Sequence, residues 1–188
     1  FHQIGREMDL RATIASNEKV ALETVAGAAM AGLRGITSMK SVGLNVASDT
    51  LFSLAYVGVR GGLVIVSADD PHAHSSQSEQ DGRFFAPYAY VPMLEPSDPS
   101  DAKEMVRRAF DISERFEVPT LIRTVTRVNH QSGIVELGTL ERTPFQKVSW
   151  PHEPTRFVTV AESARRFKLN MLRRAREIAD EFEGSEFN

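Results

Sequence analysis

Cysteine is absent from this sequence of 188 residues. The chain therefore carries no disulfide framework, no thiolate ligands for an iron–sulfur cluster and no cysteine nucleophile. An excess of one sign of charge is also absent: the formal net charge is -3, and no face-forming run of Lys and Arg precedes the C-terminal helix. This charge pattern gives no indication of nucleic-acid binding.

Long hydrophobic runs and targeting signals are missing as well. The longest apolar run, residues 61–68, has the length of a buried strand and is far shorter than a membrane span. No secretory signal is visible. We therefore expect a cytoplasmic domain without membrane contact. Because the sequence begins with Phe1 and its opening residues lack a clear capped element, we also expect a fragment of a longer chain.

Short apolar segments alternate with helical patterns through the first two thirds of the chain. This alternation predicts βαβ units, and hence a doubly wound α/β domain with a mainly parallel sheet and helices on both faces. The expected strands are residues 36–39, 63–67, 90–94 and 119–124, and the expected helices are residues 17–33, 51–57 and a segment capped near Ser100. The inward-facing residues expected in that last helix are Ala102, Val106, Ala109, Phe110 and Ser113.

The helix expected at residues 17–33 carries an acid in its first turn, Glu18, ahead of an almost wholly apolar stretch. Ser16 or Asn17 is a suitable N-cap. An acid at this position normally complements the helix dipole. The alternative is a carboxyl group held beside an apolar ligand, where it is suited to proton transfer. The residues expected to pack inward are Val20, Val25, Ala28, Ala29 and Leu22.

The character of the sequence changes after Arg127. Residues 129–157 are rich in Gly and Pro and predict an irregular segment with one short strand at 134–137. A long charged helix is expected at residues 161–183, followed by the start of a linker. We therefore divide the chain into an α/β domain, residues 1–128, and an extension, residues 129–188. The apolar side of the long helix is expected to comprise Leu169, Leu172, Ala175, Ile178 and Phe182.

Two polar segments follow expected strands, where parallel sheets bind ligands. Residues 39–45 and 69–81 are equally consistent with ordinary turn and capping residues, and the second is also consistent with a mobile loop. His72 and His74 alternate within the second segment, but two histidines alone do not make a metal site. No GxGxxG, P-loop or G-x-S-x-G motif is present.

Three long strings carry a resemblance to a known family. They are NEKVALETVAGAAMAG, MKSVGLNVASDTLFSLAYVGVRGGLVIVSADDPHAHSSQSEQD and PMLEPSDPSDAKEMVRRAFDISERFEVPTLIRTVTRV. The chain resembles the 2-oxoacid:ferredoxin oxidoreductases, and among them the amino-terminal part of the indolepyruvate-type α subunit. Ser41 departs from the family pattern, in which a larger residue is expected. The Gly- and Pro-rich first strand and turn of the family are also missing.

The resemblance implies a thiamine-diphosphate-binding fold of the pyrimidine-binding type. Its catalytic residue would be Glu18, which would hydrogen-bond to the aminopyrimidine ring and promote removal of the thiazolium proton. The residues implied to line the cofactor are Lys40, Val42, Gly43, Leu44 and Asn45. Those implied to lie near the substrate are His74, Ser75, Ser76, Gln77 and Gln80. Lys40 is either a partner for the substrate carboxylate or a surface lysine.

The resemblance also implies partners outside this chain. The cofactor would be shared with a diphosphate-binding domain of the same or a partner chain, in a homodimer or hetero-oligomer. Mg²⁺ and iron–sulfur clusters are expected outside this chain, and no metal site is expected within it. The whole enzyme would convert indolepyruvate or another aryl pyruvate to an acyl-coenzyme A and pass electrons to ferredoxin. The alternatives are a pyruvate or branched-chain 2-oxo acid enzyme, or a non-catalytic assembly module.

Overall fold

The computed structural model describes residues 10–139, 148, 150, 152–153 and 155–185. Its centre is a four-stranded sheet in the order β1 (Gly35–Lys40), β2 (Leu63–Asp69), β4 (Thr120–Val125) and β3 (Met93–Leu94). All three pairings are parallel. The α/β architecture and the parallel sheet expected from the sequence are therefore confirmed.

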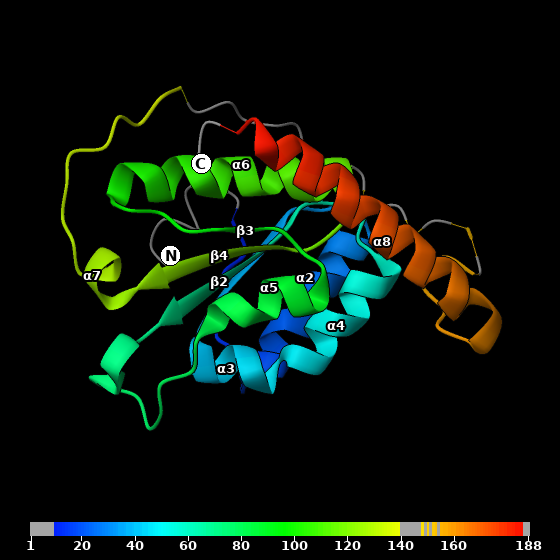
Figure 1. Ribbon diagram of the computed structural model, residues 1–188, viewed down its shortest axis with the longest axis horizontal. Helices are drawn as coiled ribbons and strands as arrows, with labels where there is room; N and C mark the ends of the chain where they lie inside the picture. The colour runs from blue at the N-terminus through cyan, green and yellow to red at the C-terminus, as the bar shows by residue number, and fades with distance from the viewer. Residues whose placement is uncertain (1–9, 140–147, 149, 151, 154, 186–188) are drawn as a thin grey trace.

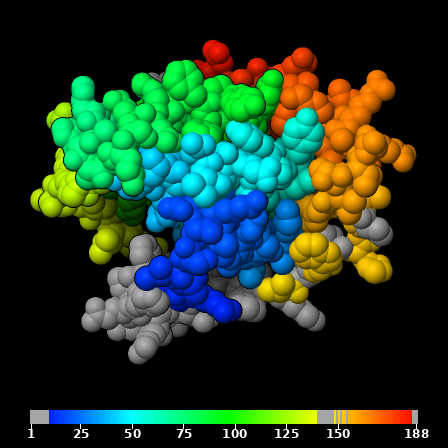
Figure 2. Space-filling view, turned by 90° about the horizontal axis from the view of Figure 1, so that it is seen from below, coloured from blue at the N-terminus to red at the C-terminus, as the bar shows by residue number. Residues whose placement is uncertain are grey.

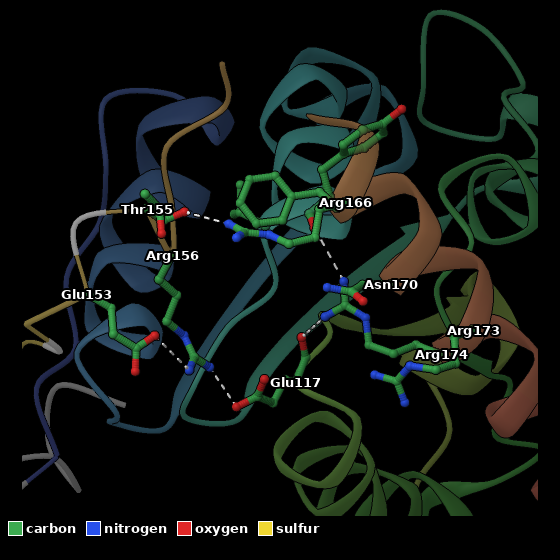
Figure 3. Close-up of a pocket in the computed structure, with 11 residues that line it drawn as sticks. Glu117, Glu153, Thr155, Arg156, Arg166, Asn170, Arg173 and Arg174 are labelled. Atoms are coloured by element: carbon green, nitrogen blue, oxygen red, sulfur yellow. Dashed lines mark hydrogen bonds and ion pairs between the residues drawn. The ribbon is translucent and has the colours of Figure 1, made fainter. Parts of the chain in front are cut away.

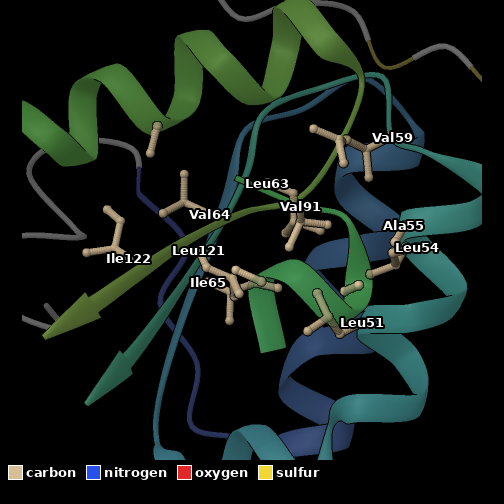
Figure 4. Close-up of a cluster of buried hydrophobic side chains, with 14 of the residues drawn as sticks. Leu51, Leu54, Ala55, Val59, Leu63, Val64, Ile65, Val91, Leu121 and Ile122 are labelled. Carbon is tan, nitrogen blue, oxygen red and sulfur yellow. The ribbon is translucent and has the colours of Figure 1, made fainter. Parts of the chain in front are cut away.

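Helices cover both faces of this sheet (Figure 1). On one face lie α2 (Glu18–Met30) and α4 (Ser48–Val57), and on the other lies α6 (Pro99–Phe116). The strand β2 packs between the two layers, and Leu63, Val64 and Ile65, its first three residues, are fully buried (Figure 4). This is the doubly wound arrangement that the alternating pattern predicts.

The helix α2 begins as expected, with Asn17 as N-cap: its Oδ1 accepts a hydrogen bond of 2.9 Å from the N–H of Val20. The buried positions, however, are Leu22, Ala26 and Ala29. The prediction that Val20 packs inward is wrong, since this side chain is 40% exposed. Figure 2, which looks onto this side of the molecule, shows α4 between α2 and α5 (Phe85–Ala89).

Two of the expected strands differ in detail. The strand β1 is only half buried, because Thr37 and Met39 face α2 while Ile36 is 40% exposed. The strand β3 is limited to Met93–Leu94, since Tyr90 adopts a left-handed conformation (φ 59°) where α5 ends. Within the described part of the chain β1 pairs with one strand only, so the additional first strand expected from the resemblance stays a prediction.

The N-cap of helix α6 lies two residues before the cap expected near Ser100. Asp98 is the N-cap, with Oδ1 accepting hydrogen bonds from the N–H groups of Ser100 and Asp101 at 2.7 and 2.9 Å. Ala109 and Ser113 are buried as expected. The remaining buried residues of this helix are Met105, Ile112 and Phe116, whereas Ala102, Val106 and Phe110 are half-buried.

The C-terminal helix α8 (Ala161–Glu183) has the bounds that the sequence predicts, and its expected apolar side is confirmed in part: Ile178 is buried, and Leu172, Ala175 and Phe182 are half-buried. Leu169 is 60% exposed, and the buried residues are Ser163, Phe167, Met171, Arg174 and Ile178. Met171 and Ile178 join the core of the α/β layers. The short strand expected at 134–137 is absent, and Ile134 is fully exposed. The proposed division after residue 128 stays a prediction.

Arg174 anchors α8 to the rest of the fold. Its side chain is 8% exposed, and Nη2 donates to the carbonyl oxygens of Ala55 and Tyr56 at 3.1 and 3.3 Å, while Nη1 donates to that of Glu117 at 2.7 Å. These acceptors belong to the end of α4 and the turn after α6, so one guanidinium joins three segments. Within the residues the structure describes, no helix is long and apolar enough to cross a membrane.

Candidate functional site at the carboxyl ends of the strands

The start of α2 rests on the short helix α3 (Ser41–Val46), which follows β1 without an intervening loop. The contact is closest at Gly43: a Cβ atom added there would lie 2.4 Å from Cγ and 2.9 Å from Oε1 of Glu18. Because carbon atoms cannot approach so closely, only glycine leaves room for the observed position of Glu18. The side chain of Glu18 is half-buried and retains access to solvent.

The segment expected as a loop at residues 39–45 is thus mostly helix, and that part of the interpretation is corrected. The chain passes directly from the extended Lys40 (φ -74°, ψ 166°), which is the N-cap, into α3. Val42 is half-buried and Asn45 exposed, so both are open to a ligand. Leu44 is fully buried in the hydrophobic core, where it supports α3 by packing.

Lys40 and Ser75 are brought together from two of the predicted site segments. The ammonium of Lys40, at the end of β1, donates to the hydroxyl and the carbonyl oxygen of Ser75 at 3.2 and 3.4 Å. Asp70, just beyond the end of β2, accepts hydrogen bonds from the N–H of Ser75 at 2.8 Å and from the hydroxyl of Thr126 at 3.0 Å. The carboxyl ends of β1, β2 and β4 are therefore linked by one polar network.

The same hydrogen bonds favour the ionised form of Asp70. Donation from the Ser75 N–H, aided by the Thr126 hydroxyl and the nearby Lys40, holds the pKa of Asp70 well below its usual value despite partial desolvation. Asp81, at the far end of the segment, has its pKa lowered to about 2, chiefly by side-chain hydrogen bonds from Arg83. Both carboxyl groups are therefore ionised at neutral pH.

Hydrogen bonds within the segment order residues 69–81. A 3₁₀ turn, η1 (Pro71–Ala73), includes His72 in a left-handed conformation (φ 65°), and the N–H of His72 donates to Glu79 Oε2 at 3.1 Å. Among the predicted substrate residues, His74, Ser75 and Gln77 are exposed, and Ser76 and Gln80 are half-buried. The described residues contain no group of three or more His, Cys, Asp or Glu that could hold a metal ion.

A buried ion pair beside this segment was not expected from the sequence. Arg123 of β4 donates from Nε to Asp69 Oδ2 at 2.6 Å and from Nη1 to Glu95 at 3.0 Å. Asp69 also accepts a 2.8 Å hydrogen bond from the N–H of Gly82, which begins the 3₁₀ turn η2 (Gly82–Phe84). The pair therefore fixes the far end of the 69–81 segment. An arginine within an otherwise buried strand was the signal, since such a charge requires a partner.

The arrangement can hold a ligand that needs both a carboxyl group and polar surface. Glu18 presents a carboxyl group above α3, and Lys40, Asn45 and Ser75 add exposed donors and acceptors at the carboxyl ends of the strands. These strand ends are the usual ligand-binding edge of a doubly wound sheet. The fold defines the chain as a doubly wound α/β domain.

Comparison with known proteins gives the family. Residues 3–179 match the family described as pyruvate flavodoxin/ferredoxin oxidoreductase, thiamine diP-bdg, a thiamine-diphosphate-binding domain, and the chain belongs to this family. It is 45% identical over 182 residues to the indolepyruvate oxidoreductase subunit IorA of Archaeoglobus fulgidus, and the matched region covers 97% of this chain and 29% of the relative. It is 48% identical to the subunit of the same name from Thermococcus kodakarensis, over 92% of this chain and 27% of the relative.

Among solved structures, the chain resembles the 2-oxoglutarate:ferredoxin oxidoreductase from Magnetococcus marinus, determined with 2-oxoglutarate, coenzyme A and succinyl-CoA bound. The TM-score is 0.66 with 13% identity, covering 94% of this chain and 38% of that chain. This similarity establishes the fold. The chain spans less than a third of the length of the IorA relatives, so it corresponds to one part of them.

Proposed function

We propose that this chain is the pyrimidine-binding half of a thiamine-diphosphate site in a 2-oxoacid:ferredoxin oxidoreductase of the indolepyruvate type. The observation that carries the proposal is the close packing of Glu18 on Gly43, because it fixes a carboxyl group at the ligand-binding edge of a domain from a thiamine-diphosphate-binding family. The IorA relatives, at 45% and 48% identity, support an aryl pyruvate such as indolepyruvate as the substrate.

The residues present fit one half of such a site. Gly43 has no side chain, and the space that a Cβ would fill is taken by the Glu18 side chain, whose carboxyl group remains partly open to solvent. Glu18 would share a proton with a ring nitrogen of the aminopyrimidine, the exchange for which a positioned carboxyl group is suited. Bound thiamine diphosphate would supply the electron sink needed for decarboxylation of a 2-oxo acid.

The neighbouring residues would complete the binding surface. Val42 and Asn45 of α3 would line the cofactor, and Leu44 would hold α3 in place from the core. Lys40 would attract the substrate carboxylate, since its exposed ammonium lies beside Ser75. The remaining exposed or half-buried residues proposed near the substrate are His74, Ser76, Gln77 and Gln80.

The rest of the reaction belongs to parts of the enzyme outside this chain. A diphosphate-binding domain would bind Mg²⁺ and the diphosphate, and iron–sulfur clusters there would pass two electrons to ferredoxin as coenzyme A takes the acyl group. We propose a homodimer or hetero-oligomer for the whole enzyme. The cytoplasmic location that the sequence predicts is part of the same proposal.

The test compares Glu18→Gln with Glu23→Gln in the whole enzyme. Both glutamates lie on α2, but Glu23 is exposed and makes only long contacts, an ion pair with Lys19 at 3.9 Å and a hydrogen bond accepted from the Thr50 hydroxyl at 3.4 Å. Dye reduction is measured with indolepyruvate and phenylpyruvate in the presence of thiamine diphosphate, Mg²⁺ and coenzyme A, and cofactor affinity is measured by calorimetry. We expect Glu18→Gln to lose at least about a hundredfold in turnover and Glu23→Gln to stay near wild type.

Near-normal turnover in a folded Glu18→Gln enzyme would mean that Glu18 only stabilises the start of α2, and would contradict the proposed site. A wild-type enzyme that binds no thiamine diphosphate would favour the assembly module instead. Activity with pyruvate or a branched-chain 2-oxo acid but not with aryl pyruvates would correct the substrate and leave the site in place.

A further inference from the structure

A cleft of about 250 Å³ lies at the amino ends of the strands, away from Glu18 and Lys40. Its walls are the end of α4, the turn between α6 and β4 at Glu117, the residues Glu153, Thr155 and Arg156, and the part of α8 from Arg166 to Arg174 (Figure 3). Because the cleft involves neither the carboxyl ends of the strands nor the 69–81 segment, it is distinct from the proposed thiamine-diphosphate site.

Arginine dominates the lining of this cleft. Among the described residues, four arginines and two acids, Glu117 and Glu153, contribute to it; the arginines are Arg156, Arg166, Arg173 and Arg174. Arg156 pairs with both acids, at 2.6 Å to Glu117 and 3.9 Å to Glu153, and Arg173 pairs through Nη1 with Glu177, which is not in the lining, at 2.7 Å. The cleft therefore has more positive than negative charge.

Two of the four arginines have no carboxylate within ion-pair distance in the described ranges. Arg166 donates to the carbonyl oxygen of Thr155 at 3.3 Å, and Arg174 donates to carbonyl oxygens alone. In the part of the chain that the structure describes, Nε of Arg174 has no hydrogen-bond partner although the side chain is 92% buried. A buried guanidinium without a counter-charge is energetically costly, and a nearby anion would compensate it.

We propose that this cleft binds a small oxyanion, a phosphate or carboxylate group held by the guanidinium groups of Arg166 and Arg173 with the charge of Arg174 behind them. Planar guanidinium groups match the oxygens of such anions in paired hydrogen bonds. The volume is below the range of about 300–1,000 Å³ typical of sites for larger ligands, so the cleft fits an anionic group rather than a whole nucleotide cofactor.

The position of the cleft gives the bound anion a second effect. Arg166, Arg173 and Arg174 belong to α8, whereas Glu117 and Tyr56 belong to the α/β layers. An anion that neutralises the arginines would lower the repulsion between them and hold α8 more firmly against α4. Occupancy of the cleft would therefore stabilise the docking of the C-terminal helix.

The test is a calorimetric titration of the whole protein with inorganic phosphate and, separately, with succinate, at constant ionic strength set by chloride. Arg166→Gln removes one charge from the cleft. Arg165→Gln removes the same charge from the adjacent residue of α8, which is exposed and does not line the cleft. We expect the Kd of the preferred anion to rise at least about tenfold in Arg166→Gln and to stay within about twofold of wild type in Arg165→Gln.

The two anions distinguish the chemical source of the ligand, since tighter binding of phosphate indicates a phosphate group and tighter binding of succinate a carboxylate. Circular dichroism confirms that each variant is folded, and Arg173→Gln replaces Arg166→Gln if the latter is not. Absence of saturable binding by the wild-type protein would overturn the proposal, as would equal weakening in Arg165→Gln and Arg166→Gln.

Discussion

Glu18 occupies the space that a side chain at Gly43 would need: a Cβ on Gly43 would lie 2.4 Å from Cγ of Glu18. The two residues come from different helices, α2 and α3, which meet beside the end of β1. Glycine is unfavourable inside a helix, at a cost of about 0.5–1 kcal/mol relative to alanine. At position 43, however, glycine leaves the space that the Glu18 side chain occupies.

Gly43→Ala is therefore expected to impair function. The new methyl group must displace Glu18, so turnover of the whole enzyme is expected to fall at least about tenfold, in line with the loss of one positioned acid–base group. Gly27→Ala is the matched control, because Gly27 is also helical but a Cβ there meets nothing within 4 Å. That variant should keep full activity and gain about 0.5–1 kcal/mol in free energy of unfolding. Equal activities would show that Glu18 can move without consequence.

Much of the fold could be predicted from the sequence, because apolar strands and helical segments alternate clearly. The phase of the helices was harder to predict. In α2, small apolar residues surround the helix, so composition did not distinguish Val20, which is exposed, from Leu22, which is buried. In α8 the expected side is right at Ile178 and Phe182 but wrong at Leu169, because the buried side includes Arg174, a charged residue that a sequence pattern assigns to the surface.

The candidate site can be predicted only in part, because some of its contacts follow from the sheet topology and others join residues far apart in the sequence. Lys40 and Ser75 each follow a strand of a parallel sheet, so their proximity follows from topology. The ion pair between Asp69 and Arg123 joins residues 54 positions apart, and one sequence gives no measure of such a pairing. The helix α3 was missed because it begins directly at the end of β1, without the turn residues that usually separate two elements.

Breaking the Asp69–Arg123 pair is expected to cost much more than breaking an exposed one. The side chains are 2% and 9% exposed, so Arg123→Met leaves a buried carboxylate without its cation and should lower the free energy of unfolding by about 3–5 kcal/mol. Arg83→Met breaks the pair with Asp81, in which Arg83 is 62% exposed, and should cost less than about 1 kcal/mol. Urea unfolding followed by circular dichroism compares them, and similar small losses would contradict the role given to Arg123.

Stability should fall in acid because of Asp70 and Asp81. The folded-state pKa of each is lowered, that of Asp81 to about 2, so the stabilisation is complete above the unfolded-state pKa of about 3.9 and is lost as pH falls below it. Between pH 4 and pH 2, Asp70→Asn should therefore show a shallower loss of stability than wild type. Glu183→Gln, at the exposed end of α8, is the control and should follow the wild-type profile. Parallel profiles for wild type and Asp70→Asn would exclude Asp70 as a source.

Arg174→Lys should loosen α8 although the charge is kept. An ammonium cannot reach the carbonyl oxygens of Ala55, Tyr56 and Glu117 together, so buried acceptors lose their donors at a cost of about 2–4 kcal/mol. Hydrogen exchange should then accelerate in α8 and at the end of α4, while β2 remains protected. Arg173→Lys is the control, since Arg173 is 61% exposed and a lysine can still pair with Glu177. If exchange in α8 does not change, apolar packing alone holds the helix, because the guanidinium then adds nothing that an ammonium lacks.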